Sequence, residues 1–147
     1  MRVTTLGWGV KESFRRYVEM SGGEASTAGG AAQAADGTFT FAATADSDLA
    51  VDGDALSGTG RFAGTVGFKA HGGMLSVRLA DPWVEAVDGG WVLSVAETAT
   101  RRTAIAKLAP ADGGTLEAVI TLDGMQLIGD HYPPGTPLDP VRLGPAS

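Results

Sequence analysis

Pairs of glycines divide this chain into short segments, and they constrain its fold more than any other feature of the sequence. Glycine accounts for 22 of the 147 residues, and it recurs in adjacent pairs. The pairs are Gly22-Gly23, Gly29-Gly30, Gly72-Gly73, Gly89-Gly90 and Gly113-Gly114. Between them lie short apolar segments, several of which alternate hydrophobic and polar residues. This pattern is typical of strands joined by tight turns. We therefore expect a mainly β protein, an antiparallel β-sandwich or a partly open barrel.

The longest alternating segment runs from Leu56 to Ala70. Its hydrophobic side chains share one parity with Gly58, Gly60 and Gly64, and polar side chains have the other. Because glycine leaves no side chain to pack, a strand with three on one face is expected to bend or to approach other backbone closely. We expect further strands at 38–41, 74–79, 84–87, 91–95, 102–108, 116–122 and 125–128.

One early segment has helical rather than alternating spacing. Its apolar stripe consists of Val10, Phe14, Tyr17 and Val18, at positions i, i+4, i+7 and i+8. Thr4 or Thr5 would cap the start of a short N-terminal α-helix, and residues 21–23 would end it. This arrangement predicts that Tyr17 lies in the last turn, on the buried side of the helix.

The net charge, the cysteine count and the hydropathy of the sequence limit the classes of protein to which it can belong. A net charge of −6 and a pI near 4.7 argue against binding to nucleic acid or to an anionic membrane surface. With no cysteine, the chain has no disulfide and no thiolate ligand. No run approaches the roughly 18 apolar residues of a membrane span.

We expect one domain over residues 1–147, with its core at about 5–143, that is cytoplasmic as written. The alternative is a surface or secreted location, if the sequence is a trimmed form of an exported protein.

Motifs of common enzymes are absent from the sequence. It contains no Gly-x-Ser-x-Gly, no His-Glu-x-x-His and no phosphate-binding glycine loop. The acidic cluster Asp46, Asp48, Asp52 and Asp54 lacks the Glu and Gly placement of an EF-hand, and we expect it at a solvated hairpin edge. The sequence thus predicts a protein that is not an enzyme.

Three segments, in this order, carry a resemblance to a known family. They are Leu6 to Val18, the pattern Phe62-x-Gly64-x-Val66-x-Phe68-x-x-His71-Gly72, and the closing pattern Tyr132-x-x-Gly135-Thr136-x-Leu138-Asp139-Pro140. Together they resemble the HtaA domain, a haem-binding module of actinobacterial haem-uptake proteins. The resemblance covers nearly the whole chain.

The resemblance implies ferric haem b held by a tyrosinate. Tyr17 would be the axial ligand of the iron, and His71 would hold the phenol oxygen by a hydrogen bond. A free phenol has a pKa of about 10, so bound ferric iron must stabilise the phenolate. By the family pattern Ser13 would bind a haem propionate, and Lys11 and Arg16 are further candidates for that role.

His131 departs from the family, which usually has an aromatic residue before Tyr132. It would either replace a ring contact against the haem or approach the iron from the face opposite Tyr17, which would make a six-coordinate centre. We leave both open. The candidates to line an apolar cleft between the helix and the sandwich are Trp8, Phe14, Phe68 and Tyr132.

The expected function is haem uptake, transfer or storage, with haem and another haem-transfer protein as partners. The oligomeric state is open, and a homodimer is compatible with the sequence. One alternative is an all-β interaction or carbohydrate-binding module that uses exposed aromatic residues such as Trp83 and Trp91. Another is a haem-degrading enzyme.

Overall fold

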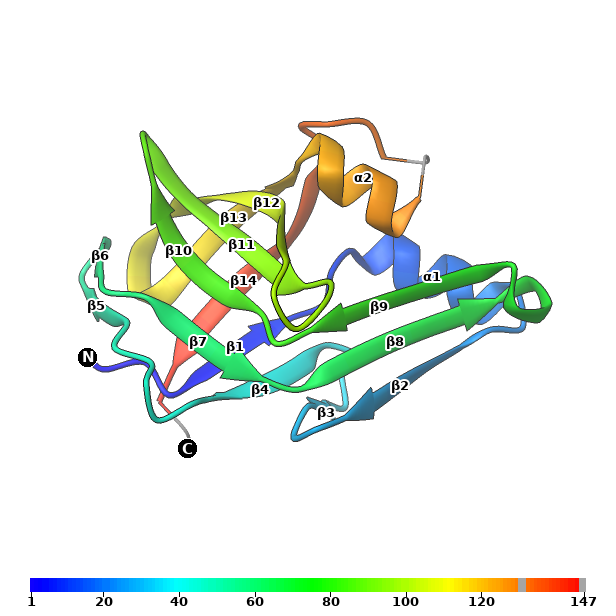
Figure 1. Cartoon of the computed structure of the whole chain (residues 1–147), viewed down its shortest axis with the longest axis horizontal. Coiled ribbons are helices and arrows are strands. Elements are labelled where there is room, and N and C mark those ends of the chain that lie inside the picture. The colour runs from blue at the N-terminus through cyan, green and yellow to red at the C-terminus, as the bar shows by residue number, and fades with distance from the viewer. Residues whose placement is uncertain (130–131, 146–147) are drawn as a thin grey trace.

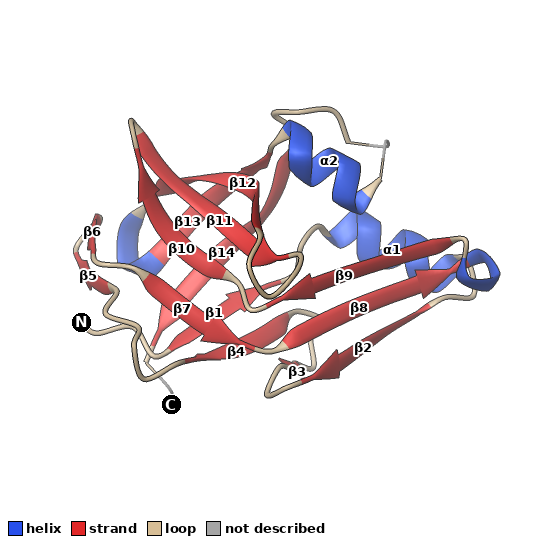
Figure 2. Ribbon diagram, in the orientation of Figure 1, coloured by secondary structure: helices blue, strands red, loops and turns tan. Residues whose placement is uncertain are grey.

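Eight antiparallel strands close into a barrel-like sandwich in the computed structural model, which describes residues 1–129 and 132–145 (Figures 1 and 2). In spatial order they are β1 (Thr5–Trp8), β14 (Pro137–Gly144), β13 (Thr115–Ile120), β12 (Arg102–Pro110), β11 (Gly90–Ala96), β10 (Trp83–Val87), β7 (Gly60–Ala63) and β4 (Phe39–Ala43). The ring closes because β1 pairs with both β14 and β4. A two-residue strand, β3 (Ala32–Gln33), extends the sheet at β4. The mainly β expectation is confirmed.

Every second side chain along the strands points into the barrel and fills its interior. On β13, for example, Leu116, Ala118 and Ile120 are buried while the residues between them are more exposed. Burial of each large aliphatic or aromatic side chain stabilises the fold by about 1.5–3 kcal/mol. The strand periodicity in the sequence is therefore the periodicity of the core.

The long segment predicted to bend does so. It becomes β6 (Ala55–Ser57), β7 and β8 (Thr65–Ala70), with breaks at Gly58 and Gly64. Gly64 has a φ of 133°, and a Cβ there would lie 2.7 Å from the backbone nitrogen of Ala31. At this bend the chain leaves the barrel and enters a second sheet, in which β8 lies between β2 (Glu24–Ala28) and β9 (Leu75–Ala80).

The acidic cluster lies at and before a hairpin of β5 (Ala50–Asp52) and β6. Asp52 and Asp54 are exposed at its turn, and an Asp48 carboxylate oxygen accepts a hydrogen bond from the Thr59 amide at 2.7 Å. The Asp46 carboxylate accepts from the Thr44 hydroxyl. Within the described residues no three acidic or histidine side chains converge as a metal site.

The described part of the chain contains two α-helices, α1 (Glu12–Met20) and α2 (Leu122–Ile128), with 3₁₀ turns η1 (His71–Gly73) and η2 (Asp112–Gly114). The strand predicted at 125–128 is wrong, because the Thr121 hydroxyl caps α2 by accepting from the Gly124 amide at 2.9 Å. A side chain at Gly124 would overlap the Ile105 carbonyl, so glycine lets this helix pack directly on β12. No helix among the described residues is long and apolar enough to span a membrane.

The start of α1 differs from the sequence expectation. Thr4 and Thr5 do not cap it, because Thr5 begins β1 and the helix starts only at Glu12. The residue at the cap position, Lys11, makes no capping side-chain hydrogen bond. Instead the Asp139 carboxylate on β14 accepts from the Glu12 amide at 3.0 Å. A carboxylate is favourable at this end of a helix because the amide dipoles point their positive ends toward it.

The same aspartate joins the helix to the barrel. Its other carboxylate oxygen lies 2.6 Å from the Arg15 guanidinium, in a half-buried ion pair. Its backbone carbonyl accepts from the Trp8 indole at 2.7 Å, and its amide donates to the Val10 carbonyl at 2.9 Å. Gly9 leaves room for this arrangement, because a Cβ there would overlap the guanidinium of Arg15. We call this set of contacts the Asp139 clamp.

Removal of the clamp is expected to cost stability. Asp139→Ala deletes the helix cap and leaves the half-buried Arg15 guanidinium without its carboxylate, so the free energy of unfolding should fall by about 2 kcal/mol. Urea denaturation measures this change. The matched control is Glu117→Ala, an exposed carboxylate on the neighbouring β13, which should change stability by less than about 0.5 kcal/mol. Equal effects of the two substitutions would contradict the clamp.

Candidate functional site

Tyr17 and His71 form a hydrogen-bonded pair, with Oη of the phenol 2.6 Å from Nε2 of the imidazole. Tyr17 comes from the last turn of α1, and His71 from η1 between β8 and β9, 54 residues further along the chain. Their ring centroids are 5.5 Å apart. The structure thus brings together the two residues that the sequence singled out.

Tyr17 does not lie on the buried side of α1, as the apolar stripe predicted. It is 36% exposed, while Phe14 and Val18 are buried. These two fill the inner face of the helix, and Phe14 packs edge-on against Phe68 with ring centroids 5.0 Å apart. Tyr17 therefore lies at the outer edge of the stripe, where its hydroxyl is accessible from solvent.

The end of α1 is held close to His71 by a glycine that sequence reasoning did not single out for this role. The Gly23 amide donates to the Val18 carbonyl at 2.8 Å, which closes the helix end. A Cβ on Gly23 would overlap the Lys69 carbonyl and lie 2.8 Å from the Ala70 side chain. Because those residues directly precede His71, the close approach at Gly23 sets the distance between Tyr17 and His71.

His71 has a left-handed backbone, with a φ of 55°. This region is sparsely populated by residues other than glycine, although histidine tolerates it better than most. The turn is closed by the Met74 amide, which donates to the His71 carbonyl at 3.2 Å. Strained backbone of this kind is common at functional sites.

A second polar pair lies one helical turn before Tyr17. The hydroxyls of Ser13 and Tyr132 are 3.2 Å apart. The ammonium of Lys11 lies 5.6 Å from the centre of the Tyr132 ring and donates to the Pro137 carbonyl at 2.7 Å. Two hydroxyls and a cation thus gather at the N-terminal end of the exposed face that carries Tyr17.

Other residues expected at the site lie elsewhere. Trp8, Phe14 and Phe68 are buried, and of these three only Phe68 is among the described residues that line a groove beside α1. Arg16 is paired with Glu12 at 2.7 Å on another side of the helix. His131 lies outside the described residues.

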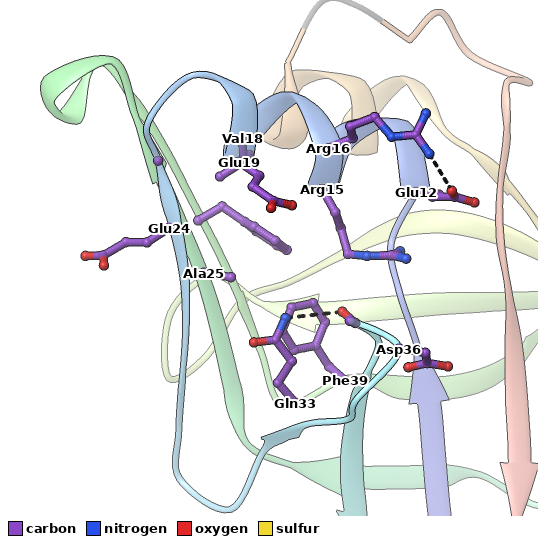
Figure 3. A pocket seen from close by; sticks show the side chains of 13 residues that line it. Glu12, Arg15, Arg16, Val18, Glu19, Glu24, Ala25, Gln33, Asp36 and Phe39 are labelled. Atoms are coloured by element: carbon purple, nitrogen blue, oxygen red, sulfur yellow. Dashed lines mark hydrogen bonds and ion pairs between the residues drawn. The ribbon is translucent and has the colours of Figure 1, made fainter.

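A groove of about 430 Å³ runs along that other side of α1 (Figure 3). It lies between the helix and the strands, as the sequence predicted for a cleft, and Phe39, Phe68 and Val18 line it together with charged side chains such as Arg15 and Glu19. The described residues that line this groove do not include the Tyr17–His71 pair or the Ser13–Tyr132 pair. The groove and the Tyr17–His71 pair are separate features.

The tryptophans expected to be exposed are half-buried. Trp83 lies under two guanidinium groups, that of Arg61 at 5.0 Å and that of Arg102 at 3.9 Å from its ring. Burial lowers the pKa of Arg102, an effect opposed by the charges of Glu85 and Asp81. Two guanidinium groups therefore lie against the Trp83 ring, which a stacked sugar would have to share with them.

The comparison with protein families decides the relationship. The model of the HtaA family (Htaa) matches residues 3–144. This chain belongs to the HtaA family. No protein with a curated description matches the sequence.

Solved structures of HtaA-family proteins from Corynebacterium glutamicum have the same fold. The C-terminal domain of HtaA is 25% identical with a TM-score of 0.74, covering 97% of this chain and 99% of that domain. The N-terminal domain of HtaA is 23% identical with a TM-score of 0.73, covering 99% and 98%. The heme-binding protein HtaB is 18% identical with a TM-score of 0.70, covering 97% and 91%.

Substitution of Gly23 tests how the pair is positioned. Gly23→Ala should force the end of α1 away from β8, break the Tyr17–His71 hydrogen bond and destabilise the fold by about 1–3 kcal/mol. The ¹⁵N shifts of the His71 ring report the hydrogen bond directly. The control is Gly22→Ala, which has open space but a φ of 71°. It should cost about 1 kcal/mol and leave those shifts unchanged, and an intact His71 signal in both variants would refute the mechanism.

Proposed function

We propose that this protein binds ferric haem b on the outer face of α1, with Tyr17 as the axial ligand of the iron, and that it carries or stores haem without catalysis. The observation that carries the proposal is the 2.6 Å hydrogen bond between the exposed Tyr17 phenol and His71. Membership of the HtaA family and the similarity to the heme-binding protein HtaB support it.

The donor set fits the group. Ferric haem would supply a hard Lewis acid, and a phenolate oxygen is a hard anionic donor that suits Fe(III). The phenol oxygen of Tyr17 is accessible from outside the fold, so a flat ligand can reach it without displacing the core. His71 holds the oxygen in place from the side, as partners of metal ligands commonly do.

A single proton links the two residues in both states. In the tautomer that leaves Nε2 of His71 without a proton, the Tyr17 hydroxyl is the donor of this hydrogen bond. When Tyr17 acts as a phenolate, its oxygen becomes the acceptor and a protonated Nε2 becomes the donor. From that tautomer the proton would pass from Oη to Nε2 within a pair that is already at hydrogen-bond distance, and the exposed imidazole would exchange it with solvent.

The hydroxyls of Ser13 and Tyr132 and the ammonium of Lys11 suit a carboxylate. Each hydroxyl can donate to a propionate oxygen, and the cation complements its charge. Ser13 lies one helical turn before Tyr17 on α1, so these groups lie toward the N-terminal end of the helix from the proposed ligand.

An interaction or carbohydrate-binding module is less well supported. It needs exposed aromatic surface, and both Trp83 and Trp91 are half-buried, with the guanidinium groups of Arg61 and Arg102 against the Trp83 ring. Whether the haem is taken up, transferred or stored, and whether the chain forms a homodimer, stay predictions.

A haemin titration followed by absorption spectroscopy tests the ligand. The parent should show one-to-one binding with ferric tyrosinate bands. Tyr17→Phe should lose those bands and bind at least about 100-fold more weakly, because the anionic ligand is gone. The chain has two tyrosines, so Tyr132→Phe is the matched control. It should keep the bands and weaken binding about 5-fold, the effect of one hydrogen bond.

Tight binding by Tyr17→Phe would move the ligand to His71 or His131 and overturn the mechanism. The same titration of His131→Phe decides whether His131 is a second ligand. Unchanged bands leave the iron five-coordinate, and shifted bands make it six-coordinate. Failure of the parent to bind haem would leave the interaction module as the better proposal.

Acid sensitivity tests the role of His71. His71→Asn tolerates the left-handed backbone, but its side chain is too short to replace the imidazole at Tyr17. A charge-assisted hydrogen bond to the phenolate is worth about 1.5–3 kcal/mol, or about 1–2 pH units. Its loss makes the phenolate easier to protonate, so the midpoint of acid-induced haem release should rise by that amount. An unchanged midpoint would show that His71 does not support the ligand.

A further inference from the structure

Two methionines stand out on the surface near the Tyr17–His71 pair. Met74 is 92% exposed and Met20 is 80% exposed, more than any other large hydrophobic residue that the structure describes. For comparison, Met1 is 52% exposed and Val87 is 48% exposed. Neither methionine takes part in the proposed ligation. Each leaves an apolar side chain in water, which is less favourable than burying it.

Helical register puts Met20 on the face that carries the site. Ser13, Tyr17 and Met20 occur at positions i, i+4 and i+7 of α1, which share one face of a helix. At 1.5 Å per residue, Ser13 lies about 6 Å before Tyr17 along the axis and Met20 about 4.5 Å beyond it. Tyr17 is thus between a hydroxyl and a thioether on one exposed strip.

The turn after β8 puts Met74 beside His71. The Met74 amide donates to the His71 carbonyl at 3.2 Å, so these two residues face each other across a tight turn. In Figure 1 this turn lies at the far end of the β8–β9 hairpin, beside the C-terminal end of α1. Both methionines therefore lie at the end of the site opposite Ser13, Tyr132 and Lys11.

We infer that Met20 and Met74 hold the hydrocarbon edge of the porphyrin and thereby fix its orientation. The inference rests on the proposed function. Haem carries its carboxylates on one edge and vinyl groups on the opposite one, and the exposed face of α1 changes from cationic and hydroxyl-bearing to apolar along its length. Only one direction of the carboxylate edge along the helix matches both ends. Thioethers are flexible and polarizable, so they suit a flat ligand that must enter and leave.

The iron is not the target of these sulfurs. Met20 and Tyr17 lie on the same face of the same helix, so both would meet a bound ring from one side, where Tyr17 is the proposed ligand. The methionines therefore act on the retention of haem rather than on its ligation. Their removal should change the rate of haem loss and leave the tyrosinate bands in place.

Protection from oxidation provides the first test. The probe is gallium(III) protoporphyrin IX, which has the same carboxylate and vinyl edges but is redox-inert, so the added hydrogen peroxide is the only oxidant. Peptide mass spectrometry then follows sulfoxide formation at each of the four methionines. Bound porphyrin should slow oxidation of Met20 and Met74 at least tenfold. Met1 is the internal control, and its rate should not change.

The two failures are distinguishable. Absorption spectroscopy first establishes whether the porphyrin binds. Bound porphyrin with Met20 and Met74 still oxidised at the apo rate would overturn the inference and leave the proposed function intact. No binding at all would overturn both.

Variant kinetics supply an independent measurement. Met20→Glu and Met74→Glu should each speed haem transfer to excess apomyoglobin about tenfold, with the tyrosinate bands unchanged. Val87→Glu introduces the same charge at an exposed apolar residue at the end of β10 and should behave as the parent. If the methionines instead form a docking patch for a protein, both variants would lose haem at the parent rate, and that result would overturn the inference.

Discussion

The carboxylate of Asp139 is the contact on which the rest of the site depends. The helix α1 has no cap from its own sequence, and Asp139 supplies one from β14 while pairing with Arg15. Since β14 lies between β1 and β13 and completes the ring of strands, the strand that closes the barrel also fixes the helix. Ser13 and Tyr17 project from that helix, so their positions are inherited from the barrel rather than from local propensity.

The C-terminal end of α1 is positioned by a close backbone contact, which is possible because Gly23 has no side chain. Gly23 allows the helix end to contact the backbone of β8, and the pair of Tyr17 and His71 results from that contact. The inner face of the helix is already filled by Phe14 and Val18. A ligand for Tyr17 must therefore come from outside, which spares the core any rearrangement on binding or release.

The periodicity of the sequence predicted local secondary structure, but it did not predict contacts between residues far apart in the chain. Alternation and glycine turns gave the strands, and helical spacing gave α1, but the same spacing put Tyr17 on the buried side because it counts a phenol as apolar. The segment that forms α2 is only seven residues long, too short for its period to exclude a strand. Its capping residue, Thr121, falls within the strand predicted at 116–122. The contact of Asp139 with the start of α1 spans 127 residues and has no local signal.

The Tyr17–His71 pair was expected only from the family resemblance, since neither residue is distinctive alone. What the structure adds is the polarity of the surface around it. Because the phenol is accessible from outside, a bound macrocycle would gain little from burial in the core. Retention must then come from the bond to Tyr17 together with contacts along the two edges of the ring. Under the proposed function, ligation would set which metal state is held, and the edges would set how long it stays. Substitutions at Met20 and Met74 would then change the rate of release without altering the proposed ligand, Tyr17.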